Sequence, residues 1–364
     1  MKKSIGLKVL VVILVLLIIV AGVLLGIKIM EDRQLQGSIK VGNSNQSGEN
    51  QTVVEIKEPE TFKGNARPIA VMIDNNIDAM PQAGLNDAYL VYEIIVEGGE
   101  TRLMALFKDV DLDKIGPIRS ARHYFLDYAL ENDAIYVHFG WSPQAQSDIS
   151  KLDVDNINGI YESSTSFWRV KDKYAPHNAV TSTEKILEMA KGDDYKLTSN
   201  IESVLNYVAD EVELDSDMEA TKITIPYSYY NTVEYEYDEQ LKEYVRYSRD
   251  KKQVDWDTKE TVTTKNIIIV KCENWTLNDG ENKGRQTLDN VKTLKGYYIT
   301  NGKAIEITAE KTSRAGQTVY KDLQGNEIEV NDGNTFIQIC PIDSKIKIEP
   351  GVKVVPETTN TISE

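Results

Sequence analysis

The stretch that decides the fold spans residues 90–109 and reads LVYEIIVEGGETRLMALFKD. Two runs rich in Val, Ile, Leu and Phe flank Gly98 and Gly99, and a glycine pair between such runs is typical of a hairpin turn. The pattern therefore predicts an antiparallel hairpin. Short buried strands are also predicted on either side of it, at residues 68–75 (PIAVMIDN) and 134–140 (AIYVHFG).

Helical patterns alternate with these strands. Apolar residues recur at helical spacing over residues 120–131, and Ser120 is a suitable cap for that helix. Ser142 before Pro143 indicates the start of a second helix. A capping-box pattern beginning at Thr181 starts a third, which is expected to end at Gly192. This half of the chain is predicted to be mixed α/β.

The pattern changes to a period of two from about residue 221. Segments such as ITIPYS, VEYEYDEQLKEYVRYS, KNIIIVKCENW and GYYITNGKAIEIT alternate apolar with polar residues, and the dipeptides Asn301-Gly302 and Asp332-Gly333 indicate turns. We therefore predict an α/β domain over 66–192, a linker over 193–220 and a mainly antiparallel β domain over 221–357. A short helix at 201–208 is an alternative within the linker.

The first 33 residues contain a predicted membrane anchor. Residues 9–27 are uncharged and almost wholly apolar, and at about 1.5 Å per residue such a run crosses the roughly 30 Å hydrocarbon core as a helix. Lysines precede the run, so the N-terminus is predicted to be cytoplasmic and the folded domains extracytoplasmic. Residues 1–33 form this start and anchor. Residues 34–65, rich in Gly, Ser, Asn and Gln, are a predicted disordered tether.

Composition limits the classes of partner. The 364 residues carry 41 Lys and Arg against 57 Asp and Glu, for a net charge of −16. This charge opposes sequence-independent binding to nucleic acid, so we expect no nucleic-acid partner. The three histidines match no zinc spacing and there is no phosphate-loop motif, so neither metal nor cofactor is expected. Cys272 and Cys340 are either paired or two buried free thiols.

Carboxylates and one histidine are the catalytic candidates. They are Asp74, Glu93, Glu97 and His177, which lie at predicted strand ends, in the hairpin and in a polar loop. Glu93 and Glu97 share one face of a strand but are about 13 Å apart, too far for the paired carboxylates of a glycosidase without another group. The plainer alternative for Glu97 is a salt bridge to Arg102 across the hairpin.

The binding candidates are mostly basic, aromatic or amide side chains. In GPIRSAR, residues 116–122, a turn precedes a predicted helix start, where N–H groups and guanidinium groups can hold a phosphate or carboxylate. Pairing of these arginines with acidic residues, and burial of His138 as a core histidine, are the plainer alternatives. The full set is Asn75, Arg102, Arg119, Arg122, His138, Trp168, Arg169 and Asn178.

Five blocks occur in a characteristic order: MIDNN, VYEIIVEGGETRLMALF, IGPIRSARHYF, HFGWSP and FWRVKDKYAPHN. Together they make the sequence similar to the YerB-like proteins, a domain-of-unknown-function family of bacterial cell-surface lipoproteins. The resemblance implies an extracytoplasmic, two-domain protein of a Gram-positive bacterium and supplies no established reaction. This sequence departs from the family in having an apolar run where a lipidated cysteine is expected.

Two functions follow as hypotheses. The first is a binding protein that holds an anionic cell-wall polymer or an envelope protein through an arginine-bearing cleft. The alternative is a hydrolase or lyase acting on a wall glycan or phosphodiester, with Asp74, Glu93 or Glu97 and with His177. Binding is favoured because no acid and base can be assigned with a suitable separation from the sequence.

Overall fold

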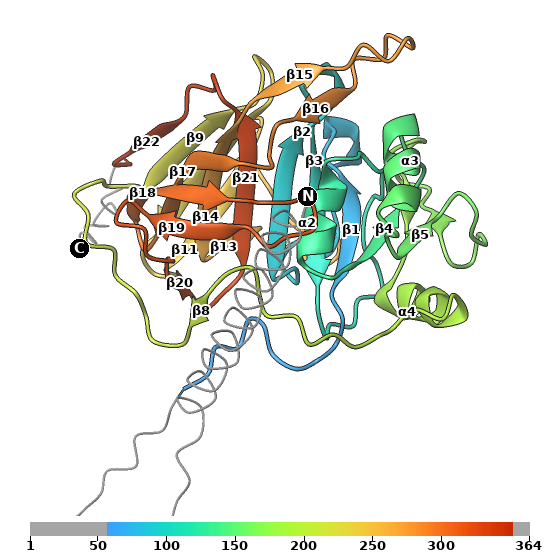
Figure 1. The fold of residues 1–364 in the computed structure, drawn as a ribbon, viewed down its shortest axis with the longest axis horizontal. Helices are drawn as coiled ribbons and strands as arrows, with labels where there is room; N and C mark the ends of the chain where they lie inside the picture. The colour runs from blue at the N-terminus through green and yellow to red at the C-terminus, as the bar shows by residue number, and fades with distance from the viewer. Residues whose placement is uncertain (1–56, 352–364) are drawn as a thin grey trace, which may run out of the picture. The chain divides into compact units, whose positions relative to one another are not determined.

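The computed structural model describes residues 57–351 (Figure 1). The predicted membrane helix at residues 9–27 and nearly all of the predicted tether lie outside the described residues. Within 57–351, no helix is both long enough and apolar enough to cross a membrane.

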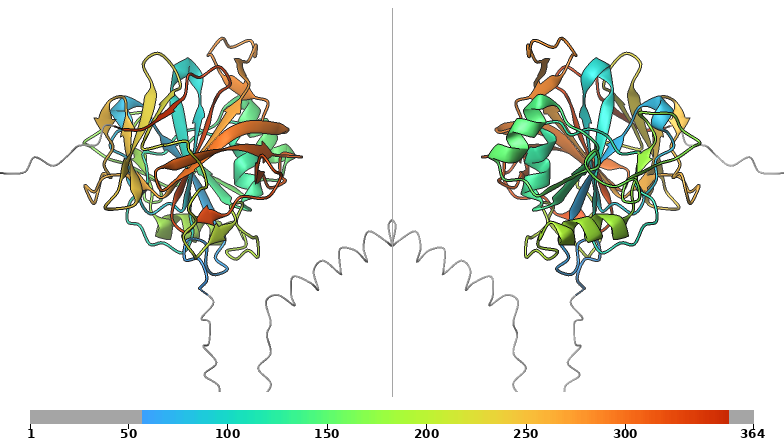
Figure 2. Two further views of the ribbon diagram at one scale, coloured as in Figure 1. Left: turned by 90° about the vertical axis from the view of Figure 1, so that its left-hand side faces the viewer. Right: turned by 90° about the vertical axis from the view of Figure 1, so that its right-hand side faces the viewer.

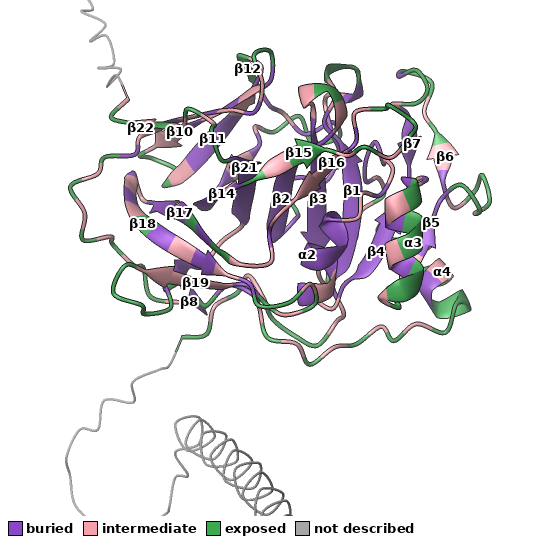
Figure 3. Ribbon diagram, turned by 45° about the horizontal axis from the view of Figure 1, so that its top comes forward, coloured by how far each residue is buried: buried purple, intermediate pink, exposed green. Residues whose placement is uncertain are grey.

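A ten-stranded sheet forms the centre of the described part of the chain, and Figure 1 shows it running from β18 and β17 at the left to β5 at the right. Most of its strands are buried along their length (Figure 3). In sheet order the strands are β19 (Val319–Asp322), β18 (Lys303–Glu310), β17 (Thr293–Thr300), β14 (Asn266–Cys272), β21 (Thr335–Pro341), β2 (Leu90–Ile95), β3 (Thr101–Phe107), β1 (Ile69–Asp74), β4 (Ile135–His138) and β5 (Asn156–Asn158).

Strand β21 joins the two predicted domains into this one sheet. It lies between β2 and β14 and runs parallel to both, with Thr335 opposite Leu90 on one side and Asn266 on the other. All of its residues are buried, as is usual for a parallel strand covered on both faces. The predicted antiparallel pairing of the C-terminal half is found between β14 and β17, β17 and β18, and β18 and β19, whereas the pairing of β14 with β21 is parallel.

A second sheet covers one face of the central sheet. Its alternating residues, including Ile223, Ile225 and Val233, belong to the same buried cluster as residues of the central sheet, and the Tyr235 ring packs against Phe336 of β21. Its strands are β12 (Lys251–Lys252), β11 (Glu243–Ser248), β10 (Thr232–Asp238), β9 (Lys222–Pro226) and β22 (Lys347–Glu349), with β13 (Thr263–Thr264) paired to β11. Short two-stranded pairs complete the set: β6 (Trp168–Arg169) with β7 (Ala179–Val180), β8 (Tyr207–Val208) with β20 (Val330–Asn331), and β15 (Asn274–Thr276) with β16 (Gln286–Leu288).

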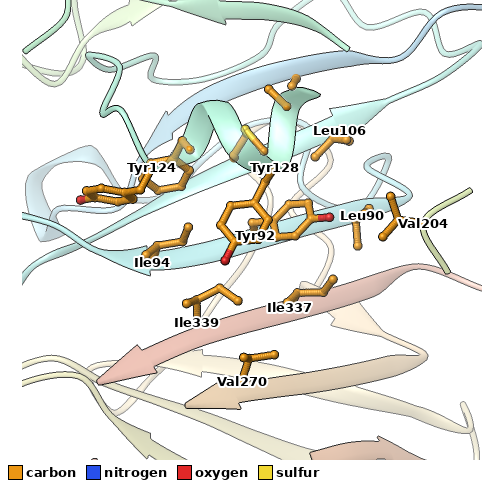
Figure 4. Packing of buried hydrophobic residues seen from close by; sticks show 14 of the residues in the cluster. Leu90, Tyr92, Ile94, Leu106, Tyr124, Tyr128, Val204, Val270, Ile337 and Ile339 are labelled. Atoms are coloured by element: carbon orange, nitrogen blue, oxygen red, sulfur yellow. The ribbon is translucent and has the colours of Figure 1, made fainter. Parts of the chain in front are cut away.

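Helices α2 (Phe125–Glu131) and α3 (Pro143–Lys151) cover the opposite face, so that Figure 2 shows them and the yellow strands of the second sheet on opposite sides. Tyr128 of α2 lies 4.8 Å from Tyr92 of β2, measured between ring centroids. Ile337 and Ile339 of β21 continue this apolar layer (Figure 4). The core thus spans both halves of the chain, which have no separate cores in the described part.

Most predicted elements of the first half are present. The hairpin is formed by β2 and β3 around the 3-10 turn η2 (Glu97–Gly99), where Gly98 and Gly99 both adopt positive φ. Helix α3 begins after Ser142, whose hydroxyl accepts from the Ala145 N–H as predicted. Helix α4 (Thr183–Gly192) ends at the predicted glycine, but its cap is Ser182 and not Thr181.

One predicted helix is present but begins later than expected, and the alternative helix in the linker is absent. Helix α2 begins at Phe125, and Ser120 is no cap, because its hydroxyl donates to the Phe139 carbonyl. The preceding residues instead pair with β1 and with the segment after β4. No helix forms at 201–208, where the chain enters the short strand β8.

The two cysteines are free and buried. Cys272 belongs to the apolar layer under α2, whereas Cys340 belongs to the layer under the second sheet. They sit on neighbouring strands with a one-residue offset, since Cys340 is opposite Lys271. Because successive side chains of a strand point to opposite faces, the two thiols cannot pair, which decides between the two alternatives.

Candidate functional site

The site lies where β1 and β4 separate. These parallel strands pair only over their first residues, up to Val71 opposite Val137. Beyond that point the segment 117–122 enters between them: the Arg119 N–H donates to the Met72 carbonyl at 2.9 Å, and the Arg119 carbonyl accepts from Phe139 N–H at 3.0 Å. Crevices at the carboxyl ends of diverging strands are common ligand sites in α/β sheets.

A cavity of about 330 Å³ opens at this edge. Five basic and three acidic side chains line it, and Val96 and Trp141 are the apolar members of the lining. The lining residues are Asp74, Asn76, Val96, Glu97, Glu100, Thr101, Arg102, Arg119, Ser120, Arg122, Trp141, Ser142, Lys283 and Arg285. Five of the predicted site residues therefore converge here: Asp74, Glu97, Arg102, Arg119 and Arg122.

Arg122 and Glu97 form a two-point ion pair at one side of the cavity. Arg122 Nε donates to Glu97 Oε1 at 2.6 Å, and Nη2 donates to Oε2 at 2.9 Å. Burial alone would raise the pKa of the Glu97 carboxyl, but the hydrogen bonds and charge of Arg122 outweigh it and lower that pKa. The predicted Glu97–Arg102 salt bridge is wrong, because the turn directs Glu97 to Arg122.

Arg102 is the most deeply buried of the three predicted arginines in the cavity, the others being Arg119 and Arg122. It lies on β3 opposite Asp74 and is 5% exposed. In the described part of the chain its side chain makes one hydrogen bond, from Nη1 to the Ser120 carbonyl. Burial and the positive charges of Arg122 and Arg119 together lower the pKa of its guanidinium to about 10, because Glu97 and Asp74 offset only part of their effect. The folded state therefore holds this charge at a cost in free energy.

Asp74 connects Arg119 with His177. Its Oδ2 atom lies 2.7 Å from His177 Nδ1 and 3.1 Å from Arg119 Nε. The carboxylate is 5% exposed, at the end of β1. Arg119 Nε is buried and has no hydrogen-bond acceptor among the described residues, because the contact with Asp74 lacks hydrogen-bond geometry. This leaves a guanidinium at the cavity with unused donor capacity.

Three predicted ligand residues hold the loop that carries His177 and do not line the cavity. Arg169 Nη1 donates to Asn178 Oδ1 at 2.6 Å, and Asn178 Nδ2 donates to the Val170 carbonyl at 3.1 Å. Trp168 packs beside Val180 and Trp256. These contacts fix the loop from which His177 reaches Asp74.

Glu93 and Asn75 are placed behind the cavity. Glu93 is fully buried; its Oε2 accepts from Arg246 Nη2 at 2.5 Å and its Oε1 accepts from Asn75 Nδ2 at 3.0 Å. Arg246 belongs to β11 of the second sheet. The structure thus separates Glu93 from the cavity, because the face of β2 that carries it is covered by that sheet.

His138 is a core histidine. It is fully buried, with Nδ1 2.8 Å from the Gly140 carbonyl and Nε2 3.1 Å from Asn156 Oδ1. Burial lowers the pKa of its imidazole. Both ring nitrogens have hydrogen-bond partners within the fold. His138 is therefore a buried core histidine, as the alternative interpretation of the sequence predicts, and does not line the cavity.

Nine of the fourteen lining residues were not predicted as site residues, and four of them show why. Trp141 and Ser142 follow β4 in the HFGWSP block, and proximity to a predicted strand end was the available signal. Lys283 and Arg285 come from the loop between β15 and β16 in the second half of the chain. Their polar segment DGENKGR is visible in the sequence, but nothing local indicates which edge it reaches.

The lining offers no metal ligand set. In residues 57–351, no group of three or more His, Cys, Asp or Glu side chains is placed to hold a metal ion. What the cavity does offer is guanidinium and ammonium donors, hydroxyl groups and one indole ring. This set is suited to binding anions that also carry polar groups.

The protein thus belongs to a class built from an α/β half, which carries an arginine-lined crevice, and a β-rich half. Residues 55–196 match the family model described as "Protein of unknown function (DUF3048) N-terminal domain", and residues 223–337 match its C-terminal domain. The chain belongs to this DUF3048 family.

A curated relative of the chain is "Putative lipoprotein YerB" of Bacillus subtilis (strain 168). The two are 31% identical over 287 residues, covering 78% of this chain and 81% of the relative. The crystal structure of YerB from Bacillus subtilis is also similar, with a TM-score of 0.69 and coverage of 78% of this chain and 94% of that chain. The YerB-like resemblance predicted from five sequence blocks is therefore confirmed, and the mixed α/β half followed by a mainly β half fits that structure.

Proposed function

We propose that the protein binds an anionic polymer or partner of the cell envelope through the cavity lined by Arg102, Arg119 and Arg122. The observation that carries the proposal is the burial of Arg102 beside two further arginines. Like charges in a poorly solvated site cost stability, and charged groups in such environments cluster at functional sites. A phosphate or carboxylate in the cavity would compensate the charge.

The charge balance of the cavity supports this proposal. Glu97 is occupied by Arg122, and Asp74 is shared between Arg119 and His177. In the described part of the chain no carboxylate lies within salt-bridge distance of Arg102. The acidic surface of a chain with net charge −16 repels polyanions at long range, so binding is expected to be local and sensitive to salt.

The envelope location rests on two further points. A relative is named as a lipoprotein, a class held at a membrane by lipid. In this chain the apolar residues 9–27 follow Lys2, Lys3 and Lys8, which favours a single membrane-spanning helix with a cytoplasmic N-terminus. The folded part would then lie outside the cytoplasm, within reach of wall polymers.

The test is retention of the full-length protein on purified cell-wall material. Arg119→Gln should weaken retention by about 10-fold or more, since a lost charge-assisted hydrogen bond costs about 1.5 to 3 kcal/mol. Arg67→Gln is the matched control: it removes the same charge from a pair with Asp133 and Asp155 that lies outside the cavity. Equal retention of wild type and Arg119→Gln would remove the proposal.

A second candidate function is hydrolysis of a wall glycan or phosphodiester. It is favoured by the 2.7 Å contact between Asp74 and His177, because a buried carboxylate that orients an imidazole is the arrangement of a general base. Arg102 and Arg119 would stabilise developing negative charge. Glu93 has no part in it, since it is paired with Arg246 in the core.

This second function is tested by mass spectrometry of fragments released from wall material over hours. Asp74→Asn should reduce release by about 100-fold or more, because the imidazole loses its orienting charge. Asp133→Asn, which changes a carboxylate outside the cavity, should release fragments at the wild-type rate. If wild type releases nothing above a heat-inactivated control between about pH 5 and pH 8, the protein is no hydrolase of that material.

A further inference from the structure

An aromatic edge adjoins the arginine cavity. Trp141 lines the cavity, and the Tyr161 ring lies 5.7 Å from the Trp141 ring with an interplanar angle of 54°. Tyr161 is 71% exposed. The two rings therefore continue the cavity wall outward as a surface that is apolar on its faces and open to solvent.

The backbone holds this edge in place. Asn158 Oδ1 accepts from the Gly140 N–H at 2.8 Å and from the Ile160 N–H at 3.2 Å, which ties the turn before Tyr161 to the residue before Trp141. Gly140 has a φ of +81°, and a Cβ there would meet Ile160 Cδ1 at 2.8 Å. Backbone hydrogen bonds thus hold the turn that carries the exposed Tyr161 ring, so little backbone conformational entropy is lost when a ligand contacts it.

The rest of the lining contains two groups that can bind hydroxyls. They are the hydroxyls of Ser120 and Ser142, whereas the Thr101 hydroxyl donates to the buried Glu93 and accepts from buried amide groups. Ser142 Oγ accepts from the Ala145 N–H, which leaves its proton free to donate, while the Ser120 hydroxyl donates to Phe139 and keeps its lone pairs. An aromatic or nucleobase ligand would favour an enclosed apolar slot, whereas this cavity has two apolar lining residues.

We infer that the ligand is a sugar unit that carries a phosphate or a carboxylate, bound with its ring against Trp141 and Tyr161 and its charged group at Arg102 and Arg119. The inference rests on the proposed function and names the class of its ligand. A sugar ring presents C–H groups on one face, which suit the negative face of an indole or phenol ring, and hydroxyls at its rim. Tyr161 lies beyond the cavity, where the next unit of a chain would pass.

Calorimetry on the full-length protein in detergent tests this with inorganic phosphate, glucose 6-phosphate and glucose. Glucose 6-phosphate should bind about 3- to 10-fold more tightly than phosphate, the range that about 0.5 to 1.5 kcal/mol of aromatic contact provides. Tyr161→Ala, which changes a residue outside the cavity lining, should remove that difference and leave phosphate binding unchanged, and Trp141→Ala should also remove the difference. Leu323→Ala, a 63% exposed residue that follows β19, is the control and should change neither affinity.

The possible outcomes separate the inference from the proposed function. If glucose 6-phosphate binds wild type no more tightly than phosphate and glucuronate no more tightly than acetate, or if Tyr161→Ala weakens the sugar probe and the free anion alike, the sugar assignment is overturned and the anion site stands. If neither anion binds, the proposed function is lost and the assignment with it. Glucuronate compared with acetate repeats the test for carboxylates, and a ring-dependent preference with either anion supports the inference.

Discussion

At the scale of single residues, the properties of the cavity depend on which charged side chains pair with each other. Asp74, Arg102, Arg119 and Arg122 were predictable as site residues because rare charged types cluster near strand ends. Their pairing was not predictable, since Glu97 lies in a turn whose geometry directs it to Arg122. Glu93 was expected at the site but is buried in the core. Period-two alternation predicts which face of the strand carries it, but not that the second sheet covers that face.

The Glu97–Arg122 pair predicts a pH dependence of stability. The pKa of Glu97 is lowered from its ordinary value of 4.5, so the folded state binds fewer protons there than the unfolded state. The contribution of the pair is therefore present above about pH 4.5 and is lost as the pH falls through the folded-state pKa. Urea unfolding at about pH 6 and pH 3.5 should show a larger loss for wild type than for Glu97→Gln. Equal losses would contradict this assignment.

At the scale of secondary-structure elements, strands were predicted better than helices. The β2–β3 hairpin follows from a glycine pair that provides the positive φ values of its turn. The predicted helix at 120–131 begins late because residues 117–122 find backbone partners in β1 and after β4, and such tertiary hydrogen bonds override local propensity. That segment carries Arg119 and Arg122, so the same tertiary hydrogen bonds delay the helix start and place these two arginines at the cavity.

The pairing of β14 with β21 predicts inert thiols. Burial raises the pKa of both Cys272 and Cys340 to about 12, and their side chains face opposite layers. A thiol reagent at pH near 7.5 should therefore label neither cysteine in the folded protein and both after denaturation. Mild oxidant should leave the mass unchanged. A loss of two hydrogens from the folded protein would show that the thiols pair and that the strand register is wrong.

At the scale of the whole molecule, the two halves depend on each other. Strand β21 closes the edge of β2, and the buried Glu93–Arg246 pair links the central sheet to the second sheet. The change from alternating helices and strands to a period of two is readable in the sequence, and the two family models match residues 55–196 and 223–337. The shared sheet was not readable, because alternation within a strand does not say which distant strand lies beside it.

Truncation should reveal this dependence. A chain ending at residue 220 leaves the apolar β2 edge unpaired and one face of the sheet without the second sheet. We expect it to aggregate or to lack fixed tertiary structure by near-ultraviolet circular dichroism. The full-length protein should lose the structure of both halves in one cooperative transition. A soluble, folded monomer of the truncated chain would show that the α/β half is an independent domain.

The central claim is that Arg102 is buried for an anionic ligand, and thermal unfolding of Arg102→Met tests it most directly. Phosphate, compared with chloride at equal ionic strength, should raise the Tm of wild type. Arg102→Met should be at least as stable as wild type without phosphate and should not respond to it, whereas Arg67→Met, which breaks pairs with Asp133 and Asp155, should lose stability and keep the response. A wild-type Tm that phosphate leaves unchanged, or an Arg102→Met variant that is less stable and still responds, would contradict the account.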